Sequence, residues 1–465
     1  GIFMERYDLL IKNGTLVLED CCRQADLGIR DGRIAKIGCG PSDQAERVMD
    51  ATGIHVFPGA IDTHCHTMDP GPLSFREDWA SVSRAAASGG FTCLIDMPNI
   101  DPPIVNLETL EFKKETAGNT SVVDFAFWGA GILRAASHVG ELRRAGCAAF
   151  KAFTSDAGPS YPSLGNQEIV DMMEVVREAG GIMAFHAEDL EIVTELTRRA
   201  VEAGRSWNLR LHEQVRPYYA ELQAIQSILL FAAHTGCPVH ICHLSIPEGA
   251  QAVREARERG VDVTVESCAH YFLFNYEDQY NLGPFAKIMP PLRSRERSDR
   301  LWDYLKCGAI DYLGTDHGPY PEHEKMPADH NYWNSPGGAP SIDAAWPSML
   351  DEAIHRRGMK PWEIARVTSL NAARRFGLYP QKGSIREGAD ADLALVNLDE
   401  TWTYSAEHSL CKTKCPRYAY EGRSIQAKVT ATLVRGTPVW ENGQIRAESG
   451  YGRFVPSKTA GGEGK

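Results

Sequence analysis

Short apolar segments alternate with amphipathic segments from about residue 55 to residue 376. The apolar segments are short and rich in β-branched residues, which favours buried strands, and the segments between them have the helical period. The eight expected strands are Val56–Asp62, Thr92–Asp96, Val122–Trp128, Ala148–Ala152, Ile182–His186, Val239–His243, Val261–Glu266 and Asp311–Thr315. Strands and helices that alternate in this way predict an α/β protein with a parallel sheet.

The number of strands favours a closed barrel over an open sheet. Helices are expected between the strands, for example at Phe75–Ser88, Gln167–Ala179, Tyr219–His234 and Pro247–Arg259. A doubly wound open sheet would need a glycine-rich nucleotide loop after its first strand, and the GxG pair at Gly129 and Gly131 continues into Arg134 instead of a third glycine. The sequence therefore predicts a TIM-like (β/α)8 barrel over residues 55–379.

The two ends of the chain have a different pattern, with short alternating strands and tight turns. Turn signals occur at Arg30-Asp31-Gly32 and at Glu441-Asn442-Gly443. Because neither end is long enough to bury a core alone, we expect residues 4–54 and 380–450 to form one small composite β-sandwich beside the barrel. Residues 456–465 are expected to be a disordered tail, and residues 1–3, before Met4, are left out of the fold expectation.

Composition and charge exclude several classes of partner. The formal net charge of -12 leaves no basic surplus for a nucleic acid or an anionic membrane. No apolar run is long enough to span a membrane and no secretory signal pattern precedes the first strand, so a cytoplasmic protein is expected. Twelve cysteines in 465 residues do not resemble the disulfide framework of a short secreted domain.

Candidate metal ligands stand at the ends of four predicted strands. Asp62-Thr63-His64-Cys65-His66 closes the first strand, and residues two apart on a strand point to the same side, so both histidines can reach one metal. His186, His243 and Asp316 occupy the same relative place after three later strands. Each alone could be an ordinary polar residue at a strand end. Together, on the active-site face of a barrel, they predict a metal centre of a type that suits zinc well and iron, manganese or cobalt acceptably.

Lys151 ends the fourth strand with apolar neighbours on both sides, in Ala149-Phe150-Lys151-Ala152-Phe153. A charged lysine is costly to bury there unless it is paired. A salt-bridged lysine is one interpretation. The other, which we favour beside five further candidate ligands, is a carbamate formed with CO₂ that bridges two cations.

These motifs resemble the cyclic amidohydrolases: hydantoinases, dihydropyrimidinases, allantoinases and dihydroorotases. The matching segments are Gly59-x-Ile61-Asp62-x-His64-x-His66, Phe150-Lys151, Phe185-His186-Ala187-Glu188, His243-Leu244-Ser245 and Thr315-Asp316-His317. The resemblance covers nearly the whole chain and implies a barrel with a composite β-sandwich, two divalent metal ions, of which zinc is expected, and a homotetramer. It implies that one metal is held by His64, His66, Lys151 and Asp316, and the other by Lys151, His186 and His243.

The resemblance also implies a reaction, the hydrolytic opening of a small cyclic amide. Asp316 is expected to take a proton from the attacking water and to pass it to the departing ring nitrogen. Family members act on different rings. Dihydroorotases carry an Arg two residues after the HxH motif to hold a substrate carboxylate, and Met68 stands there in this chain.

The substrate motifs favour a five-membered cyclic ureide, hydantoin or allantoin. Phe150–Gly158 resembles allantoinases, whereas Leu313–Gly318 and Tyr379–Gly383 resemble hydantoinases. Allantoinase is the first alternative, followed by dihydroorotase or dihydropyrimidinase. Besides Met68, tentative substrate contacts are Ser267, Asn99 and His317.

Two hypotheses of other classes compete with this interpretation. A mononuclear aminohydrolase shares the histidines and the aspartate but lacks the lysine, so Lys151 counts against it. A non-catalytic scaffold relative of dihydropyrimidinase is expected to lose metal ligands, and all six candidate ligands are present.

Overall fold

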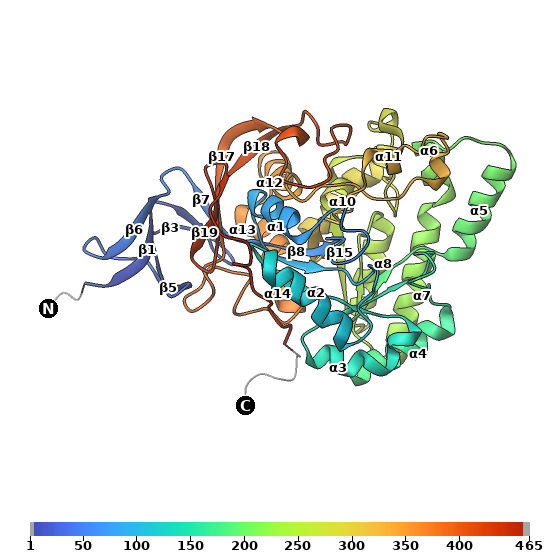
Figure 1. The fold of residues 1–465 in the computed structure, drawn as a ribbon, viewed down its shortest axis with the longest axis horizontal. Coiled ribbons are helices and arrows are strands. Elements are labelled where there is room, and N and C mark those ends of the chain that lie inside the picture. Colours follow the sequence, from blue (N-terminus) through green and yellow to red (C-terminus); the bar gives the residue numbers. More distant parts are fainter. Residues whose placement is uncertain (1–3, 459–465) are drawn as a thin grey trace.

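A computed structural model describes residues 4–458 and confirms the predicted fold class, a TIM-like barrel with a β-sandwich beside it (Figure 1). The barrel strands are β8 (Ala60–Cys65), β9 (Phe91–Asp96), β10 (Asp124–Phe127) with its continuation β11 (Gly129–Ala130), β12 (Phe150–Phe153), β13 (Met183–His186), β14 (Val239–Ile241), β15 (Val263–Cys268) and β16 (Tyr312–Gly314). All of their pairings are parallel. Every predicted barrel strand overlaps one of these.

The barrel closes between its first and last strands. Cys65 and His317 form a parallel bridge, and the backbone N–H of His66 donates to the carbonyl of His317 at 3.1 Å. Lower in the barrel, the buried carboxylate of Asp62 accepts from the Thr315 backbone N–H at 2.8 Å and from its hydroxyl at 2.6 Å. These contacts hold the segment that carries Asp316 beside the HxH strand.

The first predicted strand, Val56–Asp62, is wrong as a single element. The chain is divided at Gly59 into β7 (His55–Pro58), which belongs to the sandwich, and β8, which opens the barrel. A Cβ on Gly59 would lie 2.1 Å from the Thr92 hydroxyl oxygen, so only glycine fits where the chain passes from one domain to the other. The apolar run continues across this point, and hydrophobicity alone therefore does not mark the change of sheet.

Helices cover the outside of the barrel, and the four that the pattern predicted are present within a few residues. The helices are α1 (Trp79–Ser88), α2 (Leu107–Thr120), α3 (Val139–Arg144), α4 (Asn166–Glu178), α5 (Leu190–Glu202), α6 (Leu209–Val215), α7 (Tyr218–Thr235), α8 (Pro247–Glu258), α9 (Ala269–Leu273), α10 (Arg295–Lys306), α11 (Glu322–Lys325), α12 (Ala345–His355), α13 (Pro361–Ala365) and α14 (Asn371–Arg375). Their apolar faces pack on the strands, as on the buried side of α4.

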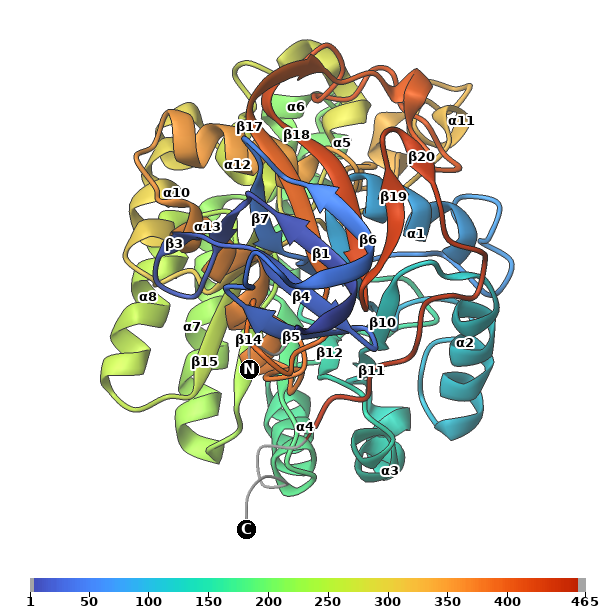
Figure 2. The ribbon, with the colours of Figure 1, turned by 90° about the vertical axis from the view of Figure 1, so that its left-hand side faces the viewer.

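Strands from both chain ends build the sandwich, which covers one side of the barrel (Figure 2). One sheet has the order β5-β4-β1-β6 and the other the order β20-β19-β18-β17-β7-β2-β3. The strands are β1 (Arg6–Lys12), β2 (Thr15–Val17), β3 (Cys22–Gln24), β4 (Leu27–Arg30), β5 (Arg33–Ile37), β6 (Gln44–Asp50), β17 (Leu393–Thr403), β18 (Ser424–Val434), β19 (Thr437–Glu441) and β20 (Gln444–Ile445). The turn predicted at Glu441-Asn442-Gly443 joins β19 to β20, with φ of 50° at Asn442 and 82° at Gly443.

The C-terminal segment differs from the expected disordered tail at residues 456–458. The buried guanidinium of Arg143 donates to the carbonyls of Ser457 and Lys458 at 3.1 and 2.9 Å, and the Ser457 backbone N–H donates to Gly146. These residues therefore lie against the barrel, because carbonyls of the tail satisfy a buried arginine. The rest of the expected tail, 459–465, lies outside the described residues.

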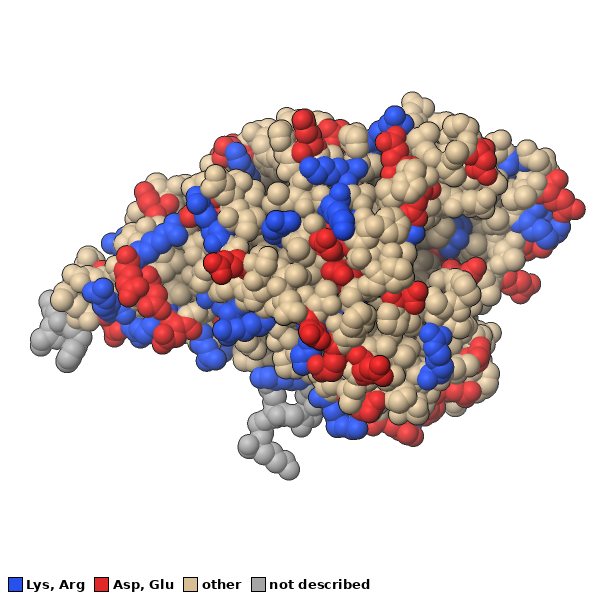
Figure 3. Space-filling model, in the orientation of Figure 1, with Lys and Arg blue, Asp and Glu red and all other residues tan. Residues whose placement is uncertain are grey.

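Three general features agree with the composition. All twelve cysteines are free thiols. Among the described residues, the helices include none with the length and hydropathy needed to cross a bilayer. On the face shown in Figure 3, acidic and basic side chains are interspersed, without a basic stripe.

Candidate metal centre

The six predicted metal ligands come from strands of the barrel or from the residue or two that follow them. His64 is the last residue but one of β8 and His66 follows that strand, Lys151 lies in β12, and His186 ends β13. His243 and Asp316 come two residues after β14 and β16. Because parallel strands end on the same face of a barrel, these side chains converge there. All six are buried except His66 and Asp316, whose side chains are 17% and 13% exposed.

The aspartate lies between the two histidines of the HxH motif. Oδ1 of Asp316 is 3.1 Å from Nε2 of His64 and 3.2 Å from Nε2 of His66. The His64 and His66 rings are 5.1 Å apart, and the His64 and His243 rings are 5.2 Å apart. One nitrogen or oxygen from each of His64, His243 and Asp316 lies within 4.8 Å of the others, which suits a shared cation.

A second pair of histidines adjoins the first. The ring centroids of His186 and His243 are 4.5 Å apart. Nε2 of His186 contacts Oε1 of Glu188 at 2.6 Å, which leaves Nδ1 of His186 for another ligand. Nδ1 of His243 is buried and has no hydrogen-bond partner among the described residues, an arrangement that a bound metal ion would relieve.

Lys151 has apolar contacts in place of a counter-charge. Its Nζ lies 3.7 Å from Sδ of Met97 and 4.9 Å from the centre of the Phe153 ring. Within residues 4–458 no carboxylate oxygen lies within 4.0 Å of this Nζ. The hydroxyl of Tyr161 donates to the Lys151 backbone carbonyl at 2.6 Å and fixes the strand beneath the side chain. The interpretation of Lys151 as a salt-bridged lysine is therefore not supported, because residues 4–458 provide no carboxylate partner for it.

The electrostatics leave most of the histidines neutral. Burial lowers the pKa of His66, His186 and His243, and the ammonium of Lys151 lowers the pKa of each further. Neutral imidazole is the form that binds a metal. Burial also opposes a charge on His64, but Asp316 and Glu266 raise its pKa well above the usual value, so a metal ion would compete with a proton there.

Asp316 is ionised at neutral pH. Burial alone would raise its pKa, but the charge of His64 and hydrogen bonds from His64 and His66 hold the pKa well below the usual range. An anionic oxygen is what both a metal ligand and a proton acceptor require.

The backbone is strained at this face of the barrel. Met68, His243 and Asp316 have φ of 62°, 35° and 49°, in the left-handed region that residues other than glycine seldom adopt. Gly314 allows the last strand to approach the first, because a Cβ there would lie 2.7 Å from Cβ of His64. Strain of this kind is typical of functional sites.

Comparisons with known proteins agree with this geometry. Residues 55–439 match the model of the Amidohydrolase family. The chain belongs to this family. It is 38% identical to an allantoinase of Rubrobacter xylanophilus, over 99% of this chain and 100% of the relative. It is 32% identical to an L-hydantoinase of Paenarthrobacter aurescens, over 97% and 98% of the two chains.

Solved structures give the same family. The structure titled L-hydantoinase (dihydropyrimidinase) from Arthrobacter aurescens superposes with a TM-score of 0.93 and 32% identity, covering 97% of this chain and all of the other. A D-hydantoinase from Thermus sp. gives a TM-score of 0.89 at 29% identity, covering 97% and 99%. The protein is thus a cyclic amidohydrolase that opens a ring by hydrolysis, as the motifs predicted.

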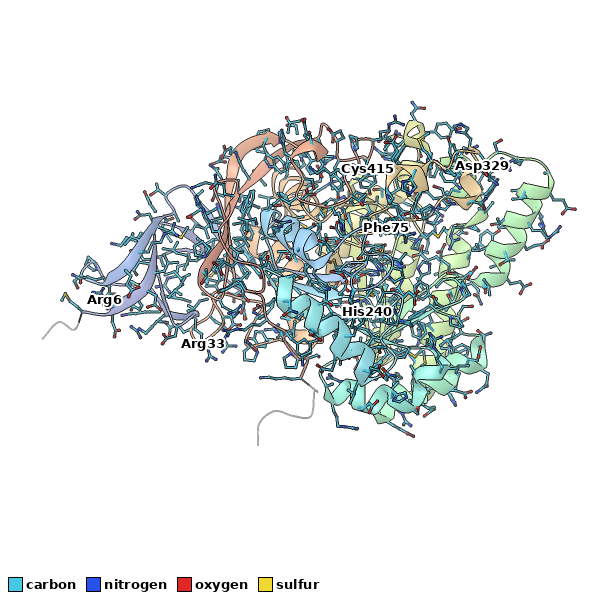
Figure 4. All side chains as sticks on the ribbon, in the orientation of Figure 1. Arg6, Arg33, Phe75, His240, Asp329 and Cys415 are labelled. Carbon is cyan, nitrogen blue, oxygen red and sulfur yellow. The ribbon has the colours of Figure 1, made fainter. Side chains whose placement is uncertain are left out.

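Glu266 is a residue of this amidohydrolase that the sequence analysis missed. Its Oε1 lies 2.7 Å from Nδ1 of His64 and accepts the His243 backbone N–H at 3.2 Å. His240, inside the barrel (Figure 4), lies with Nε2 3.7 Å from the other oxygen of Glu266, and its Nδ1 is 2.8 Å from the Tyr312 hydroxyl. Glu266, which His240 supports in turn, therefore fixes the orientation of the His64 ring. The sequence places Glu266 at the end of a strand, but a lone glutamate there does not indicate which residue it contacts.

Two predicted substrate contacts of the enzyme are engaged elsewhere. Both ring nitrogens of the buried His317 are used: Nε2 lies 3.1 Å from Glu77, and Nδ1 accepts backbone N–H groups of Ser341 and Ile342 at 3.0 and 3.3 Å. Its ring points away from Asp316 and anchors a loop, so the expected substrate contact is not supported. The hydroxyl of Ser267 donates to the Leu244 carbonyl at 2.6 Å.

The other two predicted contacts remain available. Oδ1 of Asn99 is buried and has no hydrogen-bond partner among the described residues. Met68 is 8% exposed and follows the HxH strand as predicted. Arg216, a cation beside the Glu188 that contacts His186, is engaged, because it donates to the two oxygens of Glu188 at 2.8 and 3.0 Å.

His270 is a second group that the sequence analysis missed. It is 3% exposed, burial lowers its pKa to about 4, and a ring nitrogen of it lies within 4.8 Å of an Asp316 oxygen. Its position just past a barrel strand, four residues after Glu266, could have suggested a role. A single histidine there, however, forms no motif with a second candidate ligand at a fixed spacing.

Proposed function

We propose that this cyclic amidohydrolase opens a five-membered cyclic ureide, hydantoin or allantoin, with two divalent metal ions, of which zinc is expected. The observation that carries the proposal is the convergence of four histidines, Asp316 and an unpaired buried Lys151 on one face of the barrel. The two curated relatives described above are named for allantoin and hydantoin, both five-membered ureides. A homotetramer is expected on the family resemblance.

The ligand set is proposed as follows. His64, His66, Lys151 and Asp316 would hold one ion, and Lys151, His186 and His243 the other. Loss of a proton from the Lys151 ammonium and addition of CO₂ to the resulting amine, with release of a second proton, would replace an unpaired cation by an anionic carbamate that could serve both ions. The absence of a carboxylate partner for this Nζ among residues 4–458 supports the proposal.

The chemistry then follows from the residues. Two divalent ions bound here would lower the pKa of a water molecule between them and polarise a ring carbonyl. Asp316, ionised and beside both His64 and His66, takes the proton of the attacking water and delivers it to the ring nitrogen as the C–N bond breaks. Glu266 holds the imidazole of His64 through Nδ1, so that Nε2 faces the site.

The surroundings favour an uncharged ring. A substrate carboxylate loses hydration on entry and needs a paired cation. Met68 provides an apolar thioether, and Arg216 is already paired with Glu188. A neutral ureide requires no such cation.

Turnover of a substrate panel tests the proposal. The purified enzyme, loaded with zinc, is assayed against hydantoin, 5-substituted hydantoins, allantoin, dihydrouracil and dihydroorotate, and ring opening is followed directly. We expect a hydantoin or allantoin to give the highest kcat/KM, and elemental analysis to find two ions per chain. A preference for dihydroorotate would contradict the substrate class. Full activity with one tightly bound ion would contradict the binuclear centre.

A further inference from the structure

The ring of His270 lies beside the proposed proton carrier although it comes from another segment. Helix α9 begins directly after β15, and Asp316 follows β16 by two residues. These strands are paired in parallel, with Cys268 opposite Gly314, so the residues that follow them are neighbours. A ring nitrogen of His270, Sγ of Cys268 and a carboxylate oxygen of Asp316 all lie within 4.8 Å of one another.

His270 has a polar atom without a partner. Its Nε2 is buried and forms no hydrogen bond to any described residue, although the whole side chain is 3% exposed. Buried imidazole nitrogens are normally satisfied, and an exception beside a reaction centre indicates a group that completes its bonds with a ligand. His240, inside the barrel, has an unpaired Nε2 as well, but there Glu266 lies 3.7 Å away.

The distance between the His270 ring and the Asp316 carboxylate leaves room for one polar atom between the two side chains. No hydrogen bond joins His270 to Asp316 among the described residues, and atoms up to 4.8 Å apart can both bind one polar atom at about 2.8 Å. Asp316 is the residue proposed to protonate the departing ring nitrogen. The departing ring nitrogen, which has to reach Asp316, can therefore also reach a ring nitrogen of His270, with its N–H or lone pair directed to either group.

We propose that His270 is a substrate-positioning residue, which binds the scissile ring nitrogen next to Asp316. This inference rests on the proposed function. It adds a contact on the side of the leaving group, whereas the metal ligands act on the water and the carbonyl. In this arrangement His270 orients the nitrogen that receives the proton, and its ring remains neutral throughout.

Three variants of the metal-loaded enzyme test the role. His270→Phe removes the polar atoms while keeping a planar ring, and His270→Gln keeps a hydrogen-bonding group. His355→Gln is the matched control, because His355 lies on α12 and Nε2 contacts the Leu398 carbonyl of the sandwich at 2.8 Å. We expect kcat/KM for the best ureide to fall about tenfold or more in His270→Phe, to fall less in His270→Gln, which keeps a hydrogen-bonding group, and to stay within about threefold in the control. Two metal ions per chain should remain in all three.

Binding is measured separately from turnover in an Asp316→Asn background, which slows ring opening. Adding His270→Phe to this variant should weaken the Kd for the same ureide several-fold by calorimetry. An unchanged Kd together with an unchanged kcat/KM in His270→Phe would overturn the positioning role. Failure of the wild-type enzyme to open any ureide in the panel would overturn the proposed function instead, and the Kd comparison still decides whether His270 contacts the ring.

Discussion

Two buried lysines of this protein lie in opposite surroundings. Lys382, at the junction of the barrel and the sandwich, is 2% exposed and has Asp124, Asp390 and Asp392 at 2.8, 2.9 and 2.6 Å. Lys151, at the candidate metal centre, is 1% exposed and has a thioether and an aromatic ring. Both ammonium groups lose their hydration on burial. Of the two, only the ammonium of Lys382 is compensated for this loss, by its ion pairs with carboxylates.

The difference separates a structural cluster from a functional one. The neighbours raise the pKa of Lys382 well above its usual value despite burial, because three carboxylates need the positive charge. At the candidate metal centre, by contrast, Nδ1 of His243 and Nε2 of His270 have no partner among the described residues. A structural charge cluster satisfies its own members, whereas a functional one leaves atoms to be satisfied by ions and substrate.

The largest expected effect comes from removing Lys151. Lys151→Ala deletes the proposed bridging ligand, so both metal content and ring opening should fall, with kcat/KM reduced by on the order of 10³-fold or more. Elemental analysis and the ureide assay measure the two quantities. Added short-chain carboxylates should partly restore both, and Lys151→Arg should not, because a guanidinium cannot become an anionic bridge. Retention of both ions in Lys151→Ala would show that the two lysines differ less than their surroundings indicate.

Asp316→Asn should separate binding of metal from transfer of the proton. The amide keeps an oxygen toward the metals but cannot accept the proton, so two ions should remain while kcat falls on the order of 10²–10⁴-fold. The same assay and metal analysis apply. Nearly unchanged turnover would mean that another group is the base, and the engagement of both His317 nitrogens makes that residue a poor candidate.

The comparison also shows what a sequence reveals about a site. The convergence of the six candidate ligands could be predicted because each lies within two residues of the end of a strand, and the strands of a (β/α)8 barrel end on one face. Lys151 could be singled out because a lysine between apolar residues is anomalous. Glu266 and His270 could not, because their roles depend on which strands are neighbours in the closed barrel.

Local sequence also does not determine the direction in which a side chain points. His317 directly follows Asp316, yet its ring turns to Glu77, since the backbone at Asp316 is left-handed and redirects the chain. In the same way, the change from sandwich to barrel at Gly59 depends on the contact with Thr92, a residue of another strand. The fold class needed only periodicity, whereas these details needed tertiary contacts.

Lys382→Met tests the structural half of the comparison. Among the described residues, removing this cation leaves Asp390 and Asp392 without a salt-bridge partner and Asp124 with Arg435 alone, so the free energy of unfolding should fall by about 3–5 kcal/mol. Denaturant unfolding at pH 8 measures the change. The loss should be smaller at pH 5.5, because burial raises the pKa of Asp392 to about 6 and a protonated carboxyl no longer needs the cation. Metal content and kcat/KM of the folded variant should match the wild type, and loss of metal would contradict the separation of the two clusters.

Glu266→Gln addresses the group that orients His64. The amide can still accept a hydrogen bond from Nδ1 but carries no charge to strengthen it, so metal affinity should fall about 10–100-fold. Competition with a chelator measures the affinity. Glu248→Gln, at the surface pair with Arg297 on the outer side of the barrel, is the control. Equal affinities for both variants would mean that Glu266 acts only as a core residue.

An effect of about the same size as that of Glu266→Gln, but on substrate choice instead of metal affinity, is expected at Met68. Its backbone already has a φ of 62°, so replacing one unbranched side chain by another adds little backbone strain. Met68→Arg would place a cation beside the HxH strand, where a carboxylated ring needs one, and a charge-assisted contact contributes about 1.5–3 kcal/mol. The ratio of kcat/KM for the best neutral ureide to kcat/KM for dihydroorotate should therefore fall by about one to two decades. Met68→Leu, which keeps an apolar side chain of similar size, should leave the ratio unchanged. An arginine variant with the wild-type ratio would place the specificity elsewhere, and the unpaired Oδ1 of Asn99 would be the next group to alter.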